Sequence, residues 1–342
     1  MTMETTNSVA AVHAHQLVNV LAGAWISQAV SVAARIGIAD ELACGPQSLE
    51  ALAAKTKSHK PSLYRLLRAL ASVDIFVERD GQTFDLTPKA AFLQSSHPHS
   101  LRAYALMMGN EWVWRSWGDL ASSVETGKPA FDLAYGSPLF EYYAKNPEAA
   151  QSSVQGLSSR SRQEGEAILR AYDFSSVKSI VDIGGGQGGL LKEILAAHPN
   201  VRGTLFDIPH VIQMARGAET AGDSARLEFA AGNFFASMPA GHDLYLMKKV
   251  LHDWDDDQAR LILGNCRAAI PPHGRLLIVD QIVPAGNGPS YSKLLDLLML
   301  VLSGGRERTE AEHSHLLGSA GFDLTRVIPL MSSLCVIEAS PR

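Results

Sequence analysis

The sequence predicts an α/β protein with a mostly parallel sheet that ends in an antiparallel hairpin, preceded by a mostly helical N-terminal domain. Three observations predict this fold. After residue 178, strand-like runs alternate with helical segments, two strand-like runs close the chain, and the first half is helical in pattern except for one short β ribbon. Strands that alternate with helices form a parallel sheet whose two faces are both covered.

Length and composition indicate a protein of about two domains with a sizeable core. The chain has 342 residues, of which 46% are hydrophobic and 19% are charged, and its net charge is −5. This balance offers no basic field for nucleic acid or anionic lipid. Cys44, Cys266 and Cys335 lie far apart without a C-x-x-C pair, which argues against a disulfide framework and a thiolate metal site. We therefore expect a cytoplasmic protein with neither nucleic acid nor membrane as a partner.

The N-terminal segment differs from a secretory signal, because no early Lys or Arg precedes its apolar stretch. Asn19, Gln28 and Arg35 interrupt the apolar region 17–38, which predicts that this region does not span a bilayer. Residues 9–42 have a helical pattern, and their apolar side chains occupy more than one face. Such a helix must be covered on nearly all sides, either by a second subunit or within the monomer.

Residues 48–93 predict two short helices followed by a β ribbon. Pro61 stands near the start of the second helix, and Asp80 with Gly81 occupies the hairpin turn of the ribbon. This arrangement is the outline of a winged helix.

A winged helix raises DNA binding as an alternative function, with Tyr64, Arg65 and Arg68 on the candidate recognition helix. Between residues 46 and 95, however, Lys and Arg exceed Asp and Glu only slightly. A module that binds DNA has to neutralise many phosphates. A packing or dimerisation domain is therefore the favoured interpretation.

We predict three parts along the chain. Residues 1–100 form the helical and winged-helix domain, residues 101–170 form a helical linker, and residues 171–342 form the sheet domain. The linker is rich in aromatic side chains. Most of them are expected to serve ordinary helix packing, and some to line an apolar pocket shared with the sheet domain.

The sheet domain is predicted to contain strands at SIVDI, RGTLFDI, LEFAAGNFF, DLYLMKKVL and GRLLIVDQIV, in that order. LLKEILAAH and DDDQARLILGNCRAAI are among the helices between them. After the helix TEAEHSHLLGSAG, the runs FDLTRVIPL and SLCVIEAS are separated by only a few residues. They are close enough to pair as an antiparallel hairpin.

The stretch SIVDIGGGQGGL joins the first of these strands to a helix through a glycine-rich turn. Gly184, Gly186 and Gly189 fit the G-x-G-x-x-G spacing, which lets the backbone approach a ligand at the carboxyl end of the strand. Asp207 ends the second strand, where an acid can hold ribose hydroxyls. This spacing suits a nicotinamide dinucleotide and S-adenosylmethionine equally.

Three features favour S-adenosylmethionine. Asp182 lies beside the turn, where a carboxylate would repel a pyrophosphate but would help to hold the ammonium group of a methionine moiety. A sheet that ends with an antiparallel strand is typical of methyltransferases rather than dehydrogenases. The third feature is His252, a candidate base at the end of the fourth strand.

Several motifs together resemble the class I small-molecule O-methyltransferases of the plant caffeate and bacterial hydroxyneurosporene type. They are VDIGGGQGG, FDIPHVI, GNFF, LMKKVLHDWDDDQA and the late pair DLLML and GGRERTEAE. The resemblance extends over nearly the whole chain. It implies a Rossmann-like catalytic domain that uses S-adenosyl-L-methionine, and an N-terminal winged-helix domain that forms a homodimer.

The resemblance also implies which residues hold the cofactor. They are Gly184 and Gly186 in the loop, Asp207 at the ribose, Phe234 at the adenine and Lys248 at the cofactor edge. Asn233 is a departure, because the family often has Asp at this position of the GNFF motif. The Asn side-chain oxygen can still accept a hydrogen bond from the adenine amino group, although without a charge.

Methyl transfer to a hydroxyl group needs a base, because a phenol titrates at about pH 10 and must lose its proton as its oxygen attacks. Histidine titrates near neutrality and can take that proton. His252 is the candidate base, and Asp253 beside it either steadies the base or begins the next loop. Asp280, at the end of the fifth strand, and Glu312, on a late helix, match family positions that flank the catalytic histidine. We expect these two acids to orient its ring.

Asp255, Asp256 and Asp257 resemble a metal cluster at first sight. They precede a helix, however, and a helix N-terminus favours negative charge. We therefore interpret them as capping residues and predict no metal site.

The acceptor pocket is expected to be apolar. Its candidate walls are Met107, Met108 and Trp112 from the linker and Met299 from DLLMLVLSGG. Methionine adapts to flat aromatic faces and makes sulfur contacts with rings.

These observations predict a dimeric, cytoplasmic, S-adenosyl-L-methionine-dependent O-methyltransferase that acts on a hydroxylated aromatic or polyketide-like small molecule. N-methylation of a heteroaromatic metabolite is an alternative function. A winged-helix regulator that binds DNA is a second alternative.

Overall fold

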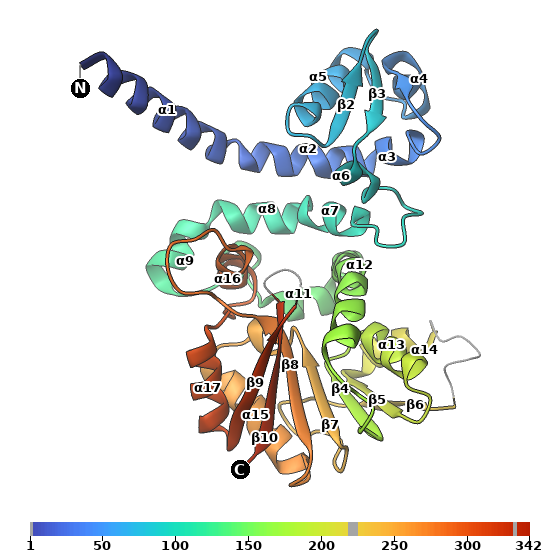
Figure 1. Ribbon diagram of the computed structural model, residues 1–342, viewed down its shortest axis with the longest axis vertical. Helices are drawn as coiled ribbons and strands as arrows, with labels where there is room; N and C mark the ends of the chain where they lie inside the picture. Colours follow the sequence, from blue (N-terminus) through green and yellow to red (C-terminus); the bar gives the residue numbers. More distant parts are fainter. Residues whose placement is uncertain (1–2, 218–224, 331–333) are drawn as a thin grey trace. The chain divides into compact units, whose positions relative to one another are not determined.

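The structure is a computed structural model that describes residues 3–217, 225–330 and 334–342 (Figure 1). The chain folds into two compact units. They comprise Met1–Trp114 with Glu148–Arg160, and Arg115–Pro147 with Ser161–Arg342. The predicted linker 101–170 is therefore divided between the two units.

The first unit is mostly helical and contains one small sheet. Its elements are α1 (Met3–Leu21), α2 (Gly23–Arg35), α3 (Ile38–Glu41), β1 (Gln47–Ser48), α4 (Leu49–Lys55), α5 (Lys60–Ala71), β2 (Phe76–Arg79), β3 (Thr83–Leu86), α6 (Pro88–Ala91) and α7 (Arg102–Met108). The helices α8 (Glu111–Gly118) and α12 (Pro147–Ala171) contribute residues to both units.

The predicted winged-helix outline is present in the first unit. The strands β1, β3 and β2 pair antiparallel in that spatial order. Pro61 lies in the first turn of α5, and Gly81 has a φ of 72° in the turn between β2 and β3. Leu67 of α5 and Phe76 of β2 are buried in the core of this segment. The hairpin predicted at Asp80 and Gly81 is therefore confirmed.

The helices α1 and α2 expose many apolar side chains. Val20, Leu21 and Trp25 are 74%, 65% and 74% exposed in the single chain. The segment 11–35 contains an 18-residue window with a mean hydropathy of 1.6 and is, by length and composition alone, apolar enough to cross a membrane. The expectation that its polar residues make it too polar for a span is therefore not met, because the apolar residues outweigh them in the average.

The second unit contains a seven-stranded sheet. Its elements are α9 (Leu120–Thr126), α10 (Ala130–Tyr135), α11 (Leu139–Lys145), β4 (Ser179–Ile183), α13 (Gly189–Ala197), β5 (Arg202–Asp207), α14 (Pro209–Gly217), β6 (Leu227–Ala231), β7 (Leu244–Lys248), the 3₁₀ turn η1 (Leu251–Asp253), α15 (Asp256–Ala269), β8 (Arg275–Gln281), α16 (Tyr291–Leu302), α17 (Glu310–Ser319), β9 (Phe322–Pro329) and β10 (Leu334–Pro341). Here α10 packs against α16, whereas α7 packs against α2 in the first unit, which explains the division of the predicted linker.

The strand order of the large sheet is β6-β5-β4-β7-β8-β10-β9. The strands β6, β5, β4, β7 and β8 run parallel, and β10 pairs antiparallel with both β8 and β9. The predicted Rossmann-like sheet with an antiparallel C-terminal hairpin is confirmed. From β4 the chain moves outward through β5 to β6 and returns on the other side of β4 with β7. Such a reversal places a ligand crevice at the carboxyl ends of β4 and β7.

Both faces of this sheet are buried. Val181 and Ile183 of β4 share a core with Ile262 of α15, whereas Ile180 of β4 shares another with Leu191 of α13. Successive side chains of a strand point to opposite faces, so a strand covered on both sides is apolar throughout. Figure 1 shows α13 and α14 beside β4 to β6, and α15 and α17 beside the other half of the sheet.

Candidate functional site

The glycine turn after β4 requires glycine for two physical reasons. Gly184, Gly186 and Gly188 have φ values of 66°, 61° and 74°, in the left-handed region that favours glycine. A Cβ on Gly184 would lie 2.9 Å from Val250, and one on Gly185 would lie 2.5 Å from Oδ2 of Asp182. A Cβ on Gly186, by contrast, would meet no described atom within 4 Å. The space beside Gly184 and Gly185 is therefore filled by neighbouring side chains, whereas the space beside Gly186 is open.

Asp207, at the end of β5, is hydrogen-bonded to the glycine turn. Its Oδ2 accepts from the backbone N–H of Gly186 at 2.9 Å, and its Oδ1 accepts from the N–H of Ile208 at 2.7 Å. Burial raises the pKa of Asp207, although these two hydrogen bonds oppose the change. The structure thus places Asp207 beside the turn, as the Rossmann-like arrangement predicts.

Asp182 lies beneath the glycine turn and is 2% exposed. Burial raises its pKa to about 7, with a lowering contribution from Lys248 and a raising contribution from Asp207. A cation close to this carboxyl would favour its ionised form and lower its pKa.

Phe234, in the segment after β6, approaches the same turn, and Asn233 precedes it in the chain. A Cβ on Gly184 would lie 3.7 Å from Cε1 of Phe234. The Oδ1 of Asn233 accepts a hydrogen bond from the N–H of Phe235 at 2.9 Å. An amide oxygen has two lone pairs, so Asn233 keeps one for a ligand.

Lys248 ends β7 and forms a buried ion pair with α12. Its Nζ lies 3.1 Å from Oε2 of Glu164 and donates to the hydroxyl of Ser161. Lys249 has a φ of 55°, and its Nζ lies 2.5 Å from Oε1 of Glu164. Consecutive strand residues point to opposite faces. The left-handed backbone at Lys249 interrupts this alternation, and the ammonium groups of Lys248 and Lys249 both reach the carboxylate of Glu164.

His252 lies in the 3₁₀ turn that follows β7 and is 8% exposed. Its Nδ1 is 2.7 Å from Oε1 of Glu307, and its Nε2 is 3.7 Å from Oδ1 of Asp253. Burial lowers the pKa of His252, but Asp253, Glu307 and Asp280 raise it more, to about 9. The bond at Nδ1 fixes the ring and leaves Nε2 as the nitrogen available for proton exchange.

The expectation that Glu312 orients His252 is wrong. Glu312 lies in the first turn of α17, where it forms a capping box with Thr309. Its Oε1 also accepts from Arg306 at 2.7 Å, and its side chain is 44% exposed. The acid that contacts the histidine is Glu307, five residues earlier in the same GGRERTEAE motif, with a fully buried side chain. The spacing T-x-x-E was a sequence signal that Glu312 serves the helix start.

Asp280, at the end of β8, lies near His252 without a hydrogen bond to it. The side chain is 1% exposed, and neither carboxylate oxygen has a hydrogen-bond partner among the residues that the structure describes. Burial raises the pKa of Asp280 to about 7, His252 lowers it and Glu307 raises it. Asp280 therefore contributes to the raised pKa of His252 without a hydrogen bond to the ring, and the hydrogen bond to the ring comes from Glu307.

The aspartates after His252 divide into capping and pairing roles. Oδ1 of Asp255 accepts from the N–H of Gln258 at 2.8 Å and caps α15, as predicted. Asp256 pairs with Arg308 at 2.8 Å, and Asp257 pairs with Arg260 at 2.7 Å.

The candidate pocket residues belong to different units. Met107 and Trp112 are buried and Met108 is half-buried in the first unit, whereas Met299 is buried on α16 in the second. Their joint role in one pocket stays a prediction.

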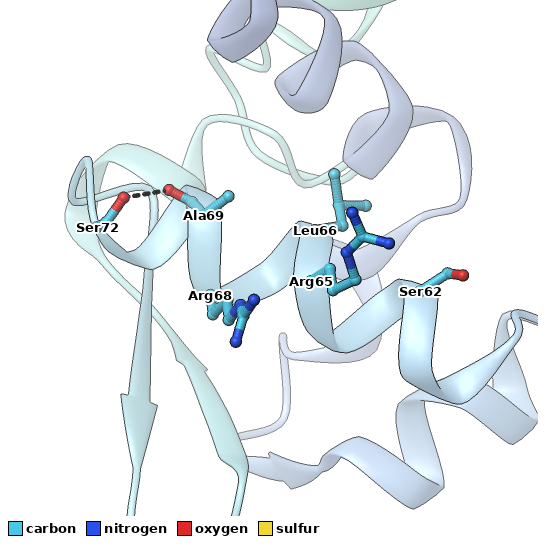
Figure 2. Close-up of a pocket in the computed structure, with 6 residues that line it drawn as sticks. All are labelled: Ser62, Arg65, Leu66, Arg68, Ala69 and Ser72. Carbon is cyan, nitrogen blue, oxygen red and sulfur yellow. Dashed lines mark hydrogen bonds between the residues drawn. The ribbon is translucent and has the colours of Figure 1, made fainter. Parts of the chain in front are cut away.

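The surface of α5 carries a groove of about 690 Å³, which is lined by Ser62, Arg65, Leu66, Arg68, Ala69 and Ser72 (Figure 2). Within the winged segment, several basic side chains have acidic partners. The pairs are Lys55 with Glu41, Lys60 with Glu50, Arg79 with Asp85 and Lys89 with Asp74. Arg68 lies over the ring of Tyr64 at 5.5 Å. These contacts reduce the positive charge that the segment offers to phosphates.

Replacing Glu307 by Gln is expected to move the rising limb of the pH–activity profile to lower pH. The carboxylate raises the pKa of His252, and a Gln oxygen accepts the same Nδ1–H bond without charge. The pKa of His252 then falls from about 9 toward its ordinary value, so the unprotonated ring is populated at lower pH. Measuring kcat/KM across the alkaline and neutral range checks this. Glu312→Gln keeps the capping box and is the matched control. If the pH–activity profile shifted in Glu312→Gln and not in Glu307→Gln, Glu307 would not be the acid that raises the pKa of His252.

Replacing Asp207 by Asn is expected to weaken binding of S-adenosylhomocysteine about 10- to 100-fold. The change removes a charged acceptor beside the glycine turn, and hydrogen bonds to charged groups contribute roughly 1.5–3 kcal/mol. Calorimetric titration measures the affinity. Asp323→Asn, at an exposed pair with Arg342, is the control. An unchanged affinity in Asp207→Asn would remove Asp207 from the cofactor site.

Comparisons with known families cover both parts of the chain. Residues 117–323 match the O-methyltransferase domain, and residues 18–96 match the O-methyltransferase dimerisation domain.

Individual relatives are similar over nearly their whole length. The chain is 45% identical to phenazine O-methyltransferase of Lysobacter antibioticus, over 95% of each chain. It is 31% identical to phenazine-1-carboxylate N-methyltransferase of Pseudomonas aeruginosa, over 96% of this chain and 97% of that one. A methyltransferase of calicheamicin biosynthesis, solved with S-adenosylhomocysteine bound, has a TM-score of 0.88 and 34% identity over 100% of both chains.

Proposed function

Because this chain belongs to the S-adenosyl-L-methionine-dependent O-methyltransferase family, we propose that it uses His252 as a general base to methylate a hydroxyl of an aromatic or polyketide-like small molecule. The observation that carries the proposal is the buried hydrogen bond between Nδ1 of His252 and Glu307. It holds the ring with Nε2 available to accept a proton. The chain is thus an enzyme of secondary metabolism, as its relatives are.

The residues around the glycine turn fit the cofactor. The turn is open above Gly186, and Asp207 is already hydrogen-bonded to it. We assign the cofactor site to Asp182, Gly184, Gly186, Asp207, Asn233, Phe234 and Lys248. When bound, the cofactor supplies an electrophilic methyl group on a sulfur that leaves as a neutral thioether.

The chain's own residues move the proton of the acceptor. Nε2 of His252 takes the hydroxyl proton as the oxygen lone pair forms its bond to the methyl group, so the acceptor is not left with a positive charge. Glu307 holds Nδ1 and balances the imidazolium charge, and the buried carboxyl of Asp280 adds to this stabilisation. A pKa of about 9 for His252 lies close to that of a phenol, which favours proton transfer between the two groups.

The names of the relatives support the proposed acceptor class. The relatives' names include a phenazine O-methyltransferase and a phenazine N-methyltransferase. We propose a flat, hydroxylated aromatic or polyketide-like acceptor, with Met107, Met108, Trp112 and Met299 as its walls. Methylation of a heteroaromatic nitrogen is the second candidate, favoured by the N-methyltransferase relative.

The experiment is to incubate the protein with methyl-labelled cofactor and a panel of phenols, hydroxylated polyketides, hydroxyphenazines and matched heteroaromatic amines. Transfer of label to oxygen, lost in His252→Ala, supports the proposal. Transfer to nitrogen alone would establish the second candidate. Transfer to oxygen that persists in His252→Ala would refute the role of the histidine.

The dimerisation-domain match supports a homodimer. We propose that residues 1–100 form its dimerisation domain and that the exposed apolar side chains of α1 and α2 are covered by the second subunit. Residues 171–342 form the catalytic domain in this proposal. We place the enzyme in the cytoplasm as a soluble dimer that binds neither nucleic acid nor membrane. Gel-shift titration at two salt concentrations tests the nucleic-acid part, since binding through the α5 arginines would weaken steeply with salt.

Methyl transfer is expected to survive treatment with a chelator. The acidic run after His252 is engaged in helix capping and in ion pairs with Arg308 and Arg260 rather than arranged around a cation. Turnover measured with and without EDTA should agree. A loss of activity that Mg²⁺ restores would contradict the proposed mechanism.

A further inference from the structure

The segment that carries Glu307 also carries a buried cation. Arg308 follows Glu307 directly, and its side chain is 1% exposed. Its backbone is fixed by a bridge to Ile282 and by the N–H of Val283, which donates to the carbonyl of Arg308 at 3.0 Å. The guanidinium thus extends from a fixed position next to the strand end of β8.

This guanidinium contacts the chain on both sides of His252. Its Nη1 donates to the carbonyl of Leu251 at 3.0 Å, and its Nη2 donates to the carbonyl of Trp254 at 3.0 Å. Leu251 precedes the histidine by one residue, and Trp254 follows it by two. One planar group therefore bridges the two ends of the turn that carries the imidazole.

The remaining donors of Arg308 are also occupied. Nε and Nη2 donate to Oδ1 of Asp256 at 2.9 and 2.8 Å. A buried charge is costly unless it is paired and hydrogen-bonded. Nη1 also donates to the carbonyl of Arg306 at 3.5 Å. Arg308 therefore meets that condition through three carbonyls and one carboxylate, a set that needs a planar fork. A lysine would keep the charge, but its donors all lie on a single nitrogen and cannot bridge the same acceptors.

We propose that Arg308 is a positioning residue for His252, because its guanidinium holds the carbonyls of Leu251 and Trp254 on either side of the imidazole. Glu307 fixes the ring and Arg308 fixes the backbone that bears it, from adjacent positions of one segment. The proposal rests on the proposed role of His252 as the base. Arg308 itself touches neither acceptor nor cofactor in this assignment.

The test compares Arg308→Lys with the wild-type protein in its full-length form, saturated with S-adenosylhomocysteine. Arg260→Lys is the matched control, since Arg260 is 45% exposed and also pairs with an aspartate of α15. Nitrogen-15 spectra of labelled histidines report how the His252 ring is bonded, and its signals are assigned by their loss in His252→Gln. Calorimetry gives the affinity for S-adenosylhomocysteine. Neither measurement requires an acceptor or methyl transfer, so a failure here is distinct from a failure of the proposed function.

We expect Arg308→Lys to shift the Nδ1 and Nε2 signals of His252 while the dissociation constant of S-adenosylhomocysteine stays within about threefold. Arg260→Lys should leave both unchanged. Unaltered His252 signals in Arg308→Lys would overturn the proposal. If Arg308→Lys lost both cofactor binding and the His252 signals, the proposal would also be overturned, because Arg308 would then support the whole fold rather than the turn. With an acceptor in hand, turnover should fall about tenfold or more at an unchanged KM for the cofactor.

Discussion

Replacing His252 with alanine is expected to lower turnover about 10²- to 10⁴-fold, the range that general-base catalysis contributes. Affinity for S-adenosylhomocysteine is expected to change less than about twofold. The imidazole bonds to Glu307 and approaches Asp253, and it makes no described hydrogen bond to a residue of the glycine turn. Its removal therefore takes away the proton acceptor and leaves the cofactor site in place.

Steady-state rates and calorimetry on the same preparation check this prediction. His273→Ala is the control, because His273 lies in the same unit with a side chain that is 74% exposed. A His252→Ala enzyme with wild-type turnover would eliminate the general base from the mechanism. Reduced cofactor binding in that variant would show that the histidine supports the fold instead.

Replacing Gly305 with alanine is expected to reduce turnover about 100-fold, because a misplacement of about 1 Å in a catalytic group can have that effect. A Cβ on Gly305 would overlap the carbonyl oxygen of His252 and lie 2.7 Å from Cα of Asp253. These atoms are backbone and cannot rotate away. The N–H of Arg306 also donates to the carbonyl of His252 at 2.9 Å. To relieve the overlap, residues 305–306 have to move away from the turn that carries His252, and this movement also breaks that hydrogen bond. Overpacking of this kind costs roughly 1–3 kcal/mol of stability.

Turnover, thermal unfolding and S-adenosylhomocysteine affinity distinguish a displaced turn from a collapsed fold. Gly264→Ala on α15 is the matched control, because a Cβ there meets no described atom within 4 Å. An alanine in a helix is expected to stabilise the protein by about 0.5–1 kcal/mol relative to glycine and to leave turnover unchanged. Wild-type turnover in Gly305→Ala would show that the turn does not depend on this close approach.

Features with a local cause could be predicted from the sequence. The parallel sheet follows from apolar strands that alternate with helices, and the C-terminal hairpin follows from two runs with too few residues between them for a crossover. The glycine turn was predictable because left-handed backbone at Gly184 and Gly186 selects glycine. Asp207 was predictable because neighbouring parallel strands end at the same edge of the sheet.

Features that depend on contacts between distant segments were not predictable. Glu307 and Glu312 lie in one motif, and only the path of the segment between α16 and α17 decides which acid reaches His252. The T-x-x-E spacing at Thr309 predicts that Glu312 caps α17, which leaves Glu307 of this motif free to reach His252. The residues 101–170 were divided between the units by packing of α7 on α2 and of α10 on α16, which a local pattern does not record.

Two hydrogen bonds of the site, one between Gly186 and Asp207 and one between His252 and Glu307, join residues that lie at different separations in the sequence. Gly186 and Asp207 are 21 residues apart, whereas His252 and Glu307 are 55 residues apart. Loop-closure entropy grows slowly with loop length, so closing the longer loop costs only about 1 kcal/mol more. The hydrogen bond between His252 and Glu307 therefore depends chiefly on the packing of α15, β8 and α16, which lie between the two residues in the chain.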